Sequence, residues 1–388
     1  MQISVWEKES FFAPADVIIL GSGLVGLWCA WHLKKNNPRS RITILDRGII
    51  PTGASTRNAG FACFGSVTEL IADREKSGED RMLQLVDMRF RGLQRTRKIL
   101  GEKAIGFQWS KGYELIAHHN DPGQTYLQEQ MDWLNEKIAP IVGSSPTYKF
   151  VNKKISQFGF NNTSHLIENK YEGHLHSGML CQQLLQRVQA LGVTVLNATT
   201  ITNFGRGSEG IDLYGNVPTP NGQQDLTLQT QQLLICTNAF ARDLLPQLDI
   251  VPARGQIIVT SPIKDLPFKG SFHYDEGFYY FRDLGDRILL GGARNKAFEE
   301  EATTQMDISN TIQNELENFL STTLIPTLSI NQDYTITDRW SGIMGMGSEK
   351  MPIIEELSPG VFCAVRMSGM GVALSALVGE EIATKMRG

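Results

Sequence analysis

The stretch ADVIILGSGLVGLWCAWHLKKNNPRSRITILDRGIIPTGASTRNAG, residues 15–60, decides the fold of this chain. It opens with the apolar run 17–20, which has the length and β-branching of a strand buried on both faces of a sheet. The motif Gly21-Ser22-Gly23-Leu24-Val25-Gly26 follows, and apolar residues then recur at helical spacing. A second apolar run, 41–45, ends on Asp46. The segment therefore predicts a strand, a tight turn, a helix and a second parallel strand.

Each glycine of this motif has a physical role in binding a dinucleotide. Gly21 permits the tight turn, Gly23 lets the backbone approach a pyrophosphate, and Gly26 lets the helix pack closely on the strand. The helix start offers unpaired N–H groups and about half a positive charge to the phosphates. Asp46 is placed to accept hydrogen bonds from a ribose diol. A glycine-rich turn in an ordinary βαβ unit is the alternative, but the agreement of strand, glycines, helix and acid favours a dinucleotide site.

The size and composition of the chain exclude several classes of function. Its 388 residues suggest about two or three domains. A net charge of −4 and a pI near 6.0 supply no basic field for a nucleic-acid partner. The five cysteines are scattered and no C-x-x-C occurs, so neither a disulfide framework nor a metal site is indicated. No apolar run reaches the roughly 18 residues of a membrane span, and no secretion signal is visible. These features predict a cytoplasmic protein.

A second candidate binding segment lies just after Asp46, at residues 53–60. Its sequence, GASTRNAG, gathers small residues around one cation, so the backbone can approach a flat or anionic ligand closely. Arg57 would supply charge, and Ser55 and Asn58 would supply hydrogen bonds. An exposed surface turn is the alternative.

The remaining pattern leaves the parallel sheet and returns to it. Apolar spacing predicts helices over 79–100, 180–191, 311–320 and 372–386. Strands are expected at 193–196, 233–236 and 360–365 for the first sheet, with an antiparallel excursion in 203–231, and at 257–260, 278–281 and 287–290 for a meander that ends in a hairpin. We therefore predict two discontinuous domains, one comprising residues 15–85, 165–250 and 335–388, and the other 86–164 and 251–334.

Taken together, these residues resemble the flavoprotein family of D-amino acid oxidase, glycine oxidase and sarcosine oxidase, and within it glycine oxidase and γ-glutamylputrescine oxidase-like members. The resemblance covers nearly the whole chain and includes, beyond the motifs above, Thr237-Asn238-Ala239, residues 252–256 (PARGQ), 340–342 (WSG) and Ser368-Gly369-Met370-Gly371. It implies an α/β fold, α+β overall, in which a Rossmann-like FAD-binding domain with a parallel sheet joins a substrate domain built on an antiparallel sheet. The active site would lie between the two domains.

The resemblance also implies which residues bind FAD. The cofactor would be noncovalent, because no cysteine lies in 340–356, where covalent members attach the flavin. The residues that would contact it are Gly21, Ser22, Gly23, Leu24, Val25, Gly26, Asp46, Arg47, Ala54, Ser55, Arg57, Asn58, Ala59, Gly60, Val195, Thr237, Asn238, Ala239, Gly342, Ser368, Gly369, Met370, Gly371 and Val372.

The implied reaction is hydride transfer from a C–H bond beside an amine nitrogen to flavin N5, which gives an imine that water hydrolyses. The substrate would be a small amine or amino acid, and the electron acceptor O2 or another oxidant. No catalytic acid or base is nominated, because the flavin carries the chemistry. A dehydrogenase with a non-oxygen acceptor, a nicotinamide-linked dehydrogenase and a non-catalytic flavin-binding protein are the alternatives.

The substrate end departs from the family pattern at two positions. Met344 falls where glycine oxidase-like members place an arginine for the substrate carboxylate, which disfavours simple α-amino acids as substrates unless Arg57, Arg254 or Arg294 takes that role. The lysine that helps O2 react in sarcosine oxidase-like members is replaced near Leu289. The residues expected to contact substrate are Phe61, Phe64, Arg254, Tyr279, Phe281 and Met344; strand alternation would send one of Tyr280 and Phe281 away from the site.

Overall fold

The computed structural model describes residues 3–219, 222–326 and 333–386, which fold around two large sheets. The first sheet is parallel at its centre, where β1 pairs with a parallel neighbour on each side. Its order is β17 (Ile353–Ser358), β18 (Val361–Val365), β11 (Gly222–Ile235), β1 (Ala15–Leu20), β2 (Ile42–Leu45) and β8 (Thr194–Leu196), with β10 (Ile211–Thr219) and β9 (Thr200–Arg206) continuing antiparallel from β11.

Strand β1 is buried on both faces, as its apolar run predicts. Val17 and Ile19 belong to a core that also contains the buried faces of α2 (Leu24–Asn36), α8 (Ser177–Ala190) and α11 (Gly371–Lys385). Ile18 and Leu20 point the other way, into a core with residues of β10 and β11. Because successive side chains of a strand alternate between faces, one short apolar run contributes side chains to both cores.

The second sheet is antiparallel except where β13 pairs in parallel with β4. Its order is β16 (Ile336–Met346), β12 (Val251–Thr260), β15 (Arg287–Gly292), β14 (Tyr279–Leu284), β13 (Ser271–Tyr274), β4 (Gly112–Ala117), β6 (Thr163–Asn169) and β5 (Tyr148–Phe150). A small separate pair joins β3 (Phe61–Ala62) to β7 (Gly173–His174). Both predicted kinds of sheet, and the predicted hairpin of β14 and β15, are therefore confirmed.

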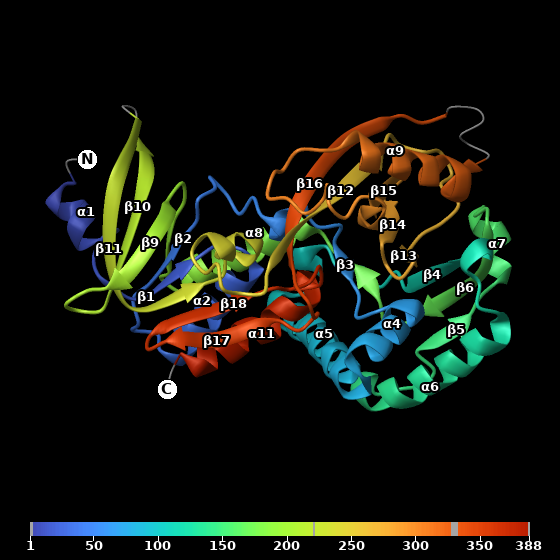
Figure 1. Ribbon diagram of the computed structural model, residues 1–388, viewed down its shortest axis with the longest axis horizontal. Helices are drawn as coiled ribbons and strands as arrows, with labels where there is room; N and C mark the ends of the chain where they lie inside the picture. The colour runs from blue at the N-terminus through green and yellow to red at the C-terminus, as the bar shows by residue number, and fades with distance from the viewer. Residues whose placement is uncertain (1–2, 220–221, 327–332, 387–388) are drawn as a thin grey trace.

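Helices cover both faces of the second sheet. One core packs α4 (Val67–Ser77), α5 (Glu79–Leu100) and α6 (Gln124–Val142) on it. Another core packs α9 (Asn310–Phe319) and the π-helix η5 (Leu320–Leu324) on it. Figure 1 shows the two sheets at opposite ends of the molecule, with α5 running between them. The other short elements are α1 (Val5–Glu9), α3 (Ala54–Arg57), α7 (Lys153–Phe158), η1 (Lys103–Ile105), η2 (His118–Asn120), η3 (Asn238–Asp243) and η4 (Arg294–Lys296).

The structure moves the expected boundaries between the two halves. Strand β16 pairs with β12 in the antiparallel sheet, so residues 336–346 do not join the parallel sheet as the division at 335 required. The division at 85/86 falls inside the continuous helix α5. That helix also packs tightly on α11. A Cβ added at Gly92 would lie only 1.9 Å from the carbonyl oxygen of Ala373. The division at 165 falls inside β6.

In the described part of the chain, no helix combines the length and the apolar character that a bilayer crossing requires.

Candidate active site

One large cavity, about 780 Å³ in volume, runs between the two sheets. Residues of the first glycine turn, Gly21 and Gly23, line one end, and Asp46 lies next to them. Tyr280 and Arg294 of the antiparallel sheet and its connections line the other end. The cavity thus joins the predicted dinucleotide site to the predicted substrate domain.

The glycine turn has the geometry that its sequence predicts. Gly21 has a φ of +101°, a conformation that L side chains rarely adopt. A Cβ at Gly26 would lie 2.2 Å from the carbonyl oxygen of Gly21, so only glycine lets α2 begin this close to β1. Helix α2 has no side-chain cap at Gly23, although Ser55 Oγ accepts a hydrogen bond from Leu24 N at 3.0 Å. The other N–H groups of its first turn would be available to an anionic ligand.

Asp46 accepts three hydrogen bonds, two of them from the same turn. Its Oδ2 accepts from the backbone N of Ser22 at 2.8 Å and from the Ser22 hydroxyl at 2.6 Å. Its Oδ1 accepts from Gly48 N at 2.8 Å. The carboxylate lines the cavity and is held in place by backbone on both sides.

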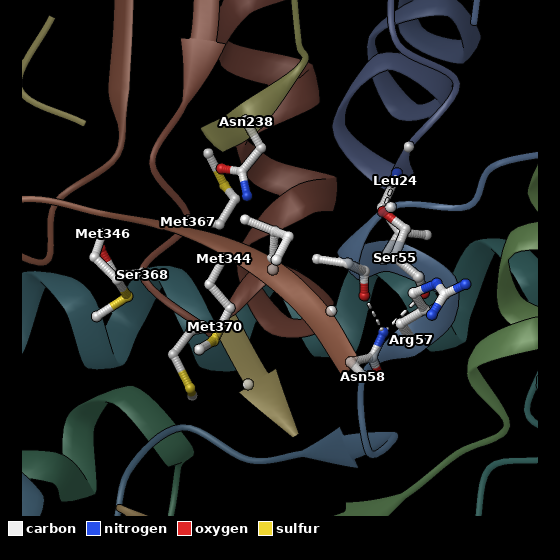
Figure 2. Close-up of a pocket in the computed structure, with 18 of the residues that line it drawn as sticks. Leu24, Ser55, Arg57, Asn58, Asn238, Met344, Met346, Met367, Ser368 and Met370 are labelled. Atoms are coloured by element: carbon white, nitrogen blue, oxygen red, sulfur yellow. Dashed lines mark hydrogen bonds between the residues drawn. The ribbon is translucent and has the colours of Figure 1, made fainter. Parts of the chain in front are cut away.

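The segment around α3 connects the cavity wall to the antiparallel sheet. Arg57 donates to the carbonyl oxygens of Thr52 at 3.0 Å and Ser341 at 2.9 Å, and Trp340 Nε1 donates to the carbonyl oxygen of Arg57 at 2.9 Å. Asn58 donates to the carbonyl oxygens of Ala54 and Ser55 (Figure 2). Arg57 is therefore occupied as a link to β16, rather than free to bind a substrate carboxylate.

A second turn faces the cavity at the start of α11. Ser368 and Gly369 have φ values of +47° and +81°, and α11 begins without a side-chain cap at Met370. The buried hydroxyls of Ser368 and Thr237 make no hydrogen bond to the described residues, and both residues line the cavity. Four methionines, Met344, Met346, Met367 and Met370, lie on the side of the cavity opposite Ser55 and Arg57 (Figure 2). This end offers unpaired N–H groups and hydroxyls beside an adaptable apolar wall.

Aromatic rings and the Arg294 guanidinium lie at the end of the cavity within the antiparallel sheet. The ring of Phe61 meets the rings of His273 and Tyr280 edge to face, with centroids 5.3 and 5.8 Å apart. The Arg294 guanidinium lies 4.7 Å from the ring centroid of Phe298. It forms no hydrogen bond or ion pair within the described ranges, and burial lowers its pKa.

Behind these rings lies a buried group of charged residues. Lys350, which lines the cavity, pairs with Asp73 at 2.7 Å and Glu69 at 3.0 Å. Burial opposes the charge of Glu69, but Lys350 and Arg89 outweigh it and hold the pKa of Glu69 at about 2. Burial likewise opposes the charge of His273, yet its interactions with Cys63 and Glu172 raise its pKa well above the usual value.

Comparison with known proteins decides the family. The family described as FAD dependent oxidoreductase (DAO) matches residues 16–385. The chain belongs to this family. It is 25% identical to a probable oxidoreductase OrdL of Rhizobium meliloti, over 94% of this chain and 81% of the relative. It is 21% identical to the gamma-glutamylputrescine oxidoreductase of Escherichia coli, over 96% of this chain and 84% of the relative.

Solved structures show the same fold. L-proline dehydrogenase from P. horikoshii superimposes with a TM-score of 0.73 at 17% identity, covering 95% of this chain and 92% of that one. Glycine oxidase from Geobacillus kaustophilus superimposes with a TM-score of 0.72 at 18% identity, covering 96% and 95%. The predicted family, the FAD cofactor and the class of FAD-dependent amine or amino acid oxidoreductase are thereby confirmed.

The cavity fits FAD at both turns. The glycine cradle has no room for a Cβ at Gly26, and the unpaired Ser368 and Thr237 hydroxyls require partners that the described protein atoms do not supply. Most of the predicted cofactor residues line the cavity. Five do not, namely Ser22, Gly26, Gly60, Val195 and Ala239. Ser22 and Gly26 shape the turn instead, and Val195 packs against the helical core of the parallel sheet.

Four of the six predicted substrate residues lie away from the cavity. Arg254 is buried against Glu301, with its Nε and Nη2 3.0 and 2.7 Å from the two carboxylate oxygens. Phe281 stacks on Phe272 with centroids 4.6 Å apart. The Tyr279 hydroxyl donates to Glu315 at 2.8 Å. Phe64 packs in the core beneath α4 and α5.

Strand alternation explains the outcome for the two residues of β14, Tyr279 and Phe281. On β14, Tyr280 points into the cavity, so its neighbours Tyr279 and Phe281 point into the core. Phe61 and Met344 do line the cavity, as predicted. Sequence reasoning missed Cys63, His273 and Lys350, which come from separate elements with no motif to connect them.

Proposed function

We propose that this protein uses FAD to oxidise the C–N bond of a small amine that carries a carboxylate, that is, an amino acid or a close relative. The proposal rests on one observation: the cavity that begins at the dinucleotide turn ends at a half-buried guanidinium, Arg294, that no carboxylate of the described residues pairs with. A planar guanidinium binds a carboxylate through two parallel hydrogen bonds. Arg294 would therefore take the role for which Met344 is unsuited.

When bound, FAD supplies the acceptor for the hydride that leaves the carbon beside the amine nitrogen, and the resulting imine hydrolyses in water. The residues of the chain bind and orient. The start of α2, with Gly21 and Gly23, would hold the pyrophosphate, and Asp46 the ribose. The start of α11 favours negative charge by about 0.3–1 kcal/mol, or up to about 2 when partly buried, and would stabilise charge that develops near it.

The aromatic rings of Phe61 and Tyr280 would position the substrate between the start of α11 and Arg294. Phe61 and Tyr280 form an apolar wall beside Arg294. This wall would exclude water, and the substrate carboxylate would be the group that binds through polar contacts. With both ends of a small substrate held, its reacting carbon is kept in one orientation, and orientation is a large part of catalysis. Burial lowers the pKa of Arg294, so an anion that neutralises the guanidinium is favoured there.

The electron acceptor is O2 or another oxidant. Leu289 lies in an apolar cluster with Ala59, Ile257 and Val259, so its position offers no cation beside the cavity. This favours a dehydrogenase with a non-oxygen acceptor as the second candidate. We also place the protein in the cytoplasm, on the sequence features described above.

The experiment is an anaerobic titration of the FAD-loaded protein with matched pairs of compounds, each amino acid beside the amine that lacks its carboxylate. We expect the flavin absorbance to bleach with at least one amino acid and more weakly with its decarboxylated partner. Bleaching by amines alone would exclude the role of Arg294. No bleaching by any C–N compound would refute the proposed function. Reoxidation in air, compared with reoxidation by a quinone or dye, then identifies the acceptor.

A further inference from the structure

Three side chains with metal-binding atoms meet at the cavity wall from three separate elements. Cys63 directly follows β3, Glu172 directly precedes β7, and His273 lies on β13. The register of β3 on β7 pairs Ala62 with Gly173, which brings Cys63 and Glu172 to neighbouring positions. One ligand atom from each of the three residues lies within 4.8 Å of the other two, and His273 Nε2 is 3.4 Å from Glu172 Oε2.

We propose that Cys63, Glu172 and His273 form a binding site for a borderline divalent cation, with Zn²⁺ as the best match. A thiolate, an imidazole and a carboxylate are the donors that Zn²⁺ takes, at about 2.0–2.3 Å. In a tetrahedron of that size neighbouring ligands are about 3.3–3.8 Å apart. The separation of His273 and Glu172 already lies in this range, and side-chain adjustment has to close only the wider pairs. The sequence alone indicated no metal site, because these ligands have no characteristic spacing.

Apart from their interactions with one another, the ligand atoms of the three residues are left free by the hydrogen bonds around them. Glu172 Oε1 accepts from the backbone N of Phe64 at 3.2 Å and of Gly65 at 3.4 Å, which fixes the carboxylate and leaves Oε2 toward His273. His273 is 5% exposed, and its Nε2 makes no well-directed hydrogen bond to the described residues. Cys63 is a free thiol, 5% exposed. Carboxylates that bind metals are usually held in this way by hydrogen bonds from their surroundings.

The charge of the surroundings also favours a cation. Glu172 and the nearby Glu114 are buried, and neither pairs with a lysine or arginine of the described chain; Glu172 instead faces His273 at 3.4 Å. Buried Arg89 and half-buried Lys350, which lie in this region, pair with Glu69 instead. A divalent ion bound by a thiolate and a carboxylate would add a cation where acidic groups predominate, without leaving an unpaired buried charge.

Three protein ligands leave one coordination position of a tetrahedral ion open. Cys63 and His273 line the cavity whereas Glu172 does not, so the open position would face the end that holds Phe61 and Tyr280. On the proposed function, that is where the substrate lies. Bound Zn²⁺ would then compete with an amino acid for this end of the cavity, and the metal would act as a reversible inhibitor rather than as a participant in the oxidation.

The test uses the FAD-loaded protein and ZnCl2 or CoCl2 alone, without substrate. Equilibrium dialysis with metal analysis measures the stoichiometry and affinity. Tetrahedral Co²⁺ gives ligand-field absorption at longer wavelengths than the flavin bands, which reports the geometry. We expect one Zn²⁺ per chain and a tetrahedral cobalt spectrum. Cys63→Ser should weaken binding at least about tenfold, because a hydroxyl is a much poorer ligand for Zn²⁺ than a thiolate.

Two further variants make the result decisive. Cys363→Ser changes another buried cysteine, on β18, and should bind Zn²⁺ as the wild type does. Glu172→Gln keeps an acceptor for the Phe64 and Gly65 N–H groups but removes the charged ligand, so it should lose affinity and keep its FAD. FAD content reports the folding of each variant. If Cys63→Ser loses FAD, the Zn²⁺ affinity of Glu172→Gln decides whether the site exists.

The inference is overturned if the wild type takes up no stoichiometric Zn²⁺, or if Cys63→Ser and Glu172→Gln, with FAD retained, bind it as tightly as the wild type does. Its failure can be told apart from failure of the proposed function. Zinc binding without bleaching by any amine refutes only the function. Bleaching without zinc binding refutes only the metal site.

Discussion

Replacing Asp46 with alanine should weaken FAD binding by about 13- to 160-fold. This range follows from a hydrogen bond to a charged group, worth about 1.5–3 kcal/mol, at about 1.36 kcal/mol for each factor of ten. In the structure the carboxylate lines the cavity and accepts three hydrogen bonds, from the Ser22 backbone, the Ser22 hydroxyl and the Gly48 backbone. It is therefore held in place before the ligand arrives, and the loss should fall on affinity.

The matched control is Ser22→Ala. It removes the 2.6 Å hydrogen bond between the Ser22 hydroxyl and Asp46 but leaves the carboxylate at the cavity. If Asp46 binds the ribose, Ser22→Ala should weaken FAD binding by no more than about 13-fold, since one supporting bond is worth about 0.5–1.5 kcal/mol. If Asp46 acts only through Ser22, the two single variants and the double variant should all weaken FAD equally.

The assay is a titration of apoprotein with FAD, followed by the change in flavin fluorescence, at fixed pH and ionic strength. An unchanged dissociation constant for Asp46→Ala would remove this residue from the site. Equal losses in Asp46→Ala, Ser22→Ala and the double variant would assign it to the turn alone. A large loss with Ser22→Ala and a small one with Asp46→Ala would contradict the whole assignment of the cradle.

Four more outcomes are expected. Arg294→Leu should lower kcat/KM for an amino acid by about 13- to 160-fold but leave the matched amine unaffected, as steady-state kinetics would show; an equal loss on both would contradict carboxylate binding. Glu301→Gln should lower the free energy of unfolding, measured in urea, by up to about 3–5 kcal/mol, because it weakens the buried pair with Arg254. Asp87→Asn, which changes a half-exposed ion pair with Arg91, should change it by less than about 0.5 kcal/mol. Gly92→Ala should lower the thermal midpoint, because its Cβ would meet the Ala373 carbonyl at 1.9 Å; an unchanged midpoint would argue against the α5–α11 contact. Burial opposes the charge of Glu168, but Lys154 and Lys111 hold its pKa at about 2. The stability that Glu168 contributes should therefore be present above about pH 4.5 and be lost as the pH falls toward 2. Glu168→Gln should abolish that part of the pH dependence of unfolding.

Much of the cofactor half could be predicted from the sequence. The strand, glycines and helix of residues 17–36 are neighbours along the chain, and the physical requirements of the turn act on adjacent residues. Gly21 needs a positive φ and Gly26 needs close packing, and the structure shows both. The range of helix α5 could also be predicted, because its apolar spacing repeats over 79–100 without interruption.

The substrate half depended on pairing between distant segments. The sequence around Arg254 predicts no partner for its guanidinium. In the structure the guanidinium pairs with Glu301, 47 residues later. The direction of Tyr280, into the cavity, is set by the register of β14 between β13 and β15. A shift of one residue would have exposed Tyr279 and Phe281 to the cavity instead.

The sequence by itself therefore determined the dinucleotide turn, the alternation of parallel and antiparallel segments and the family. Only the tertiary structure decided which side chains face the cavity, and that Arg294 stays without a carboxylate partner in the described chain while Cys63, Glu172 and His273 meet. The physical reason is that local backbone conformation depends on neighbouring residues. The position of a side chain relative to distant ones depends on strand register and on which charges compete for it.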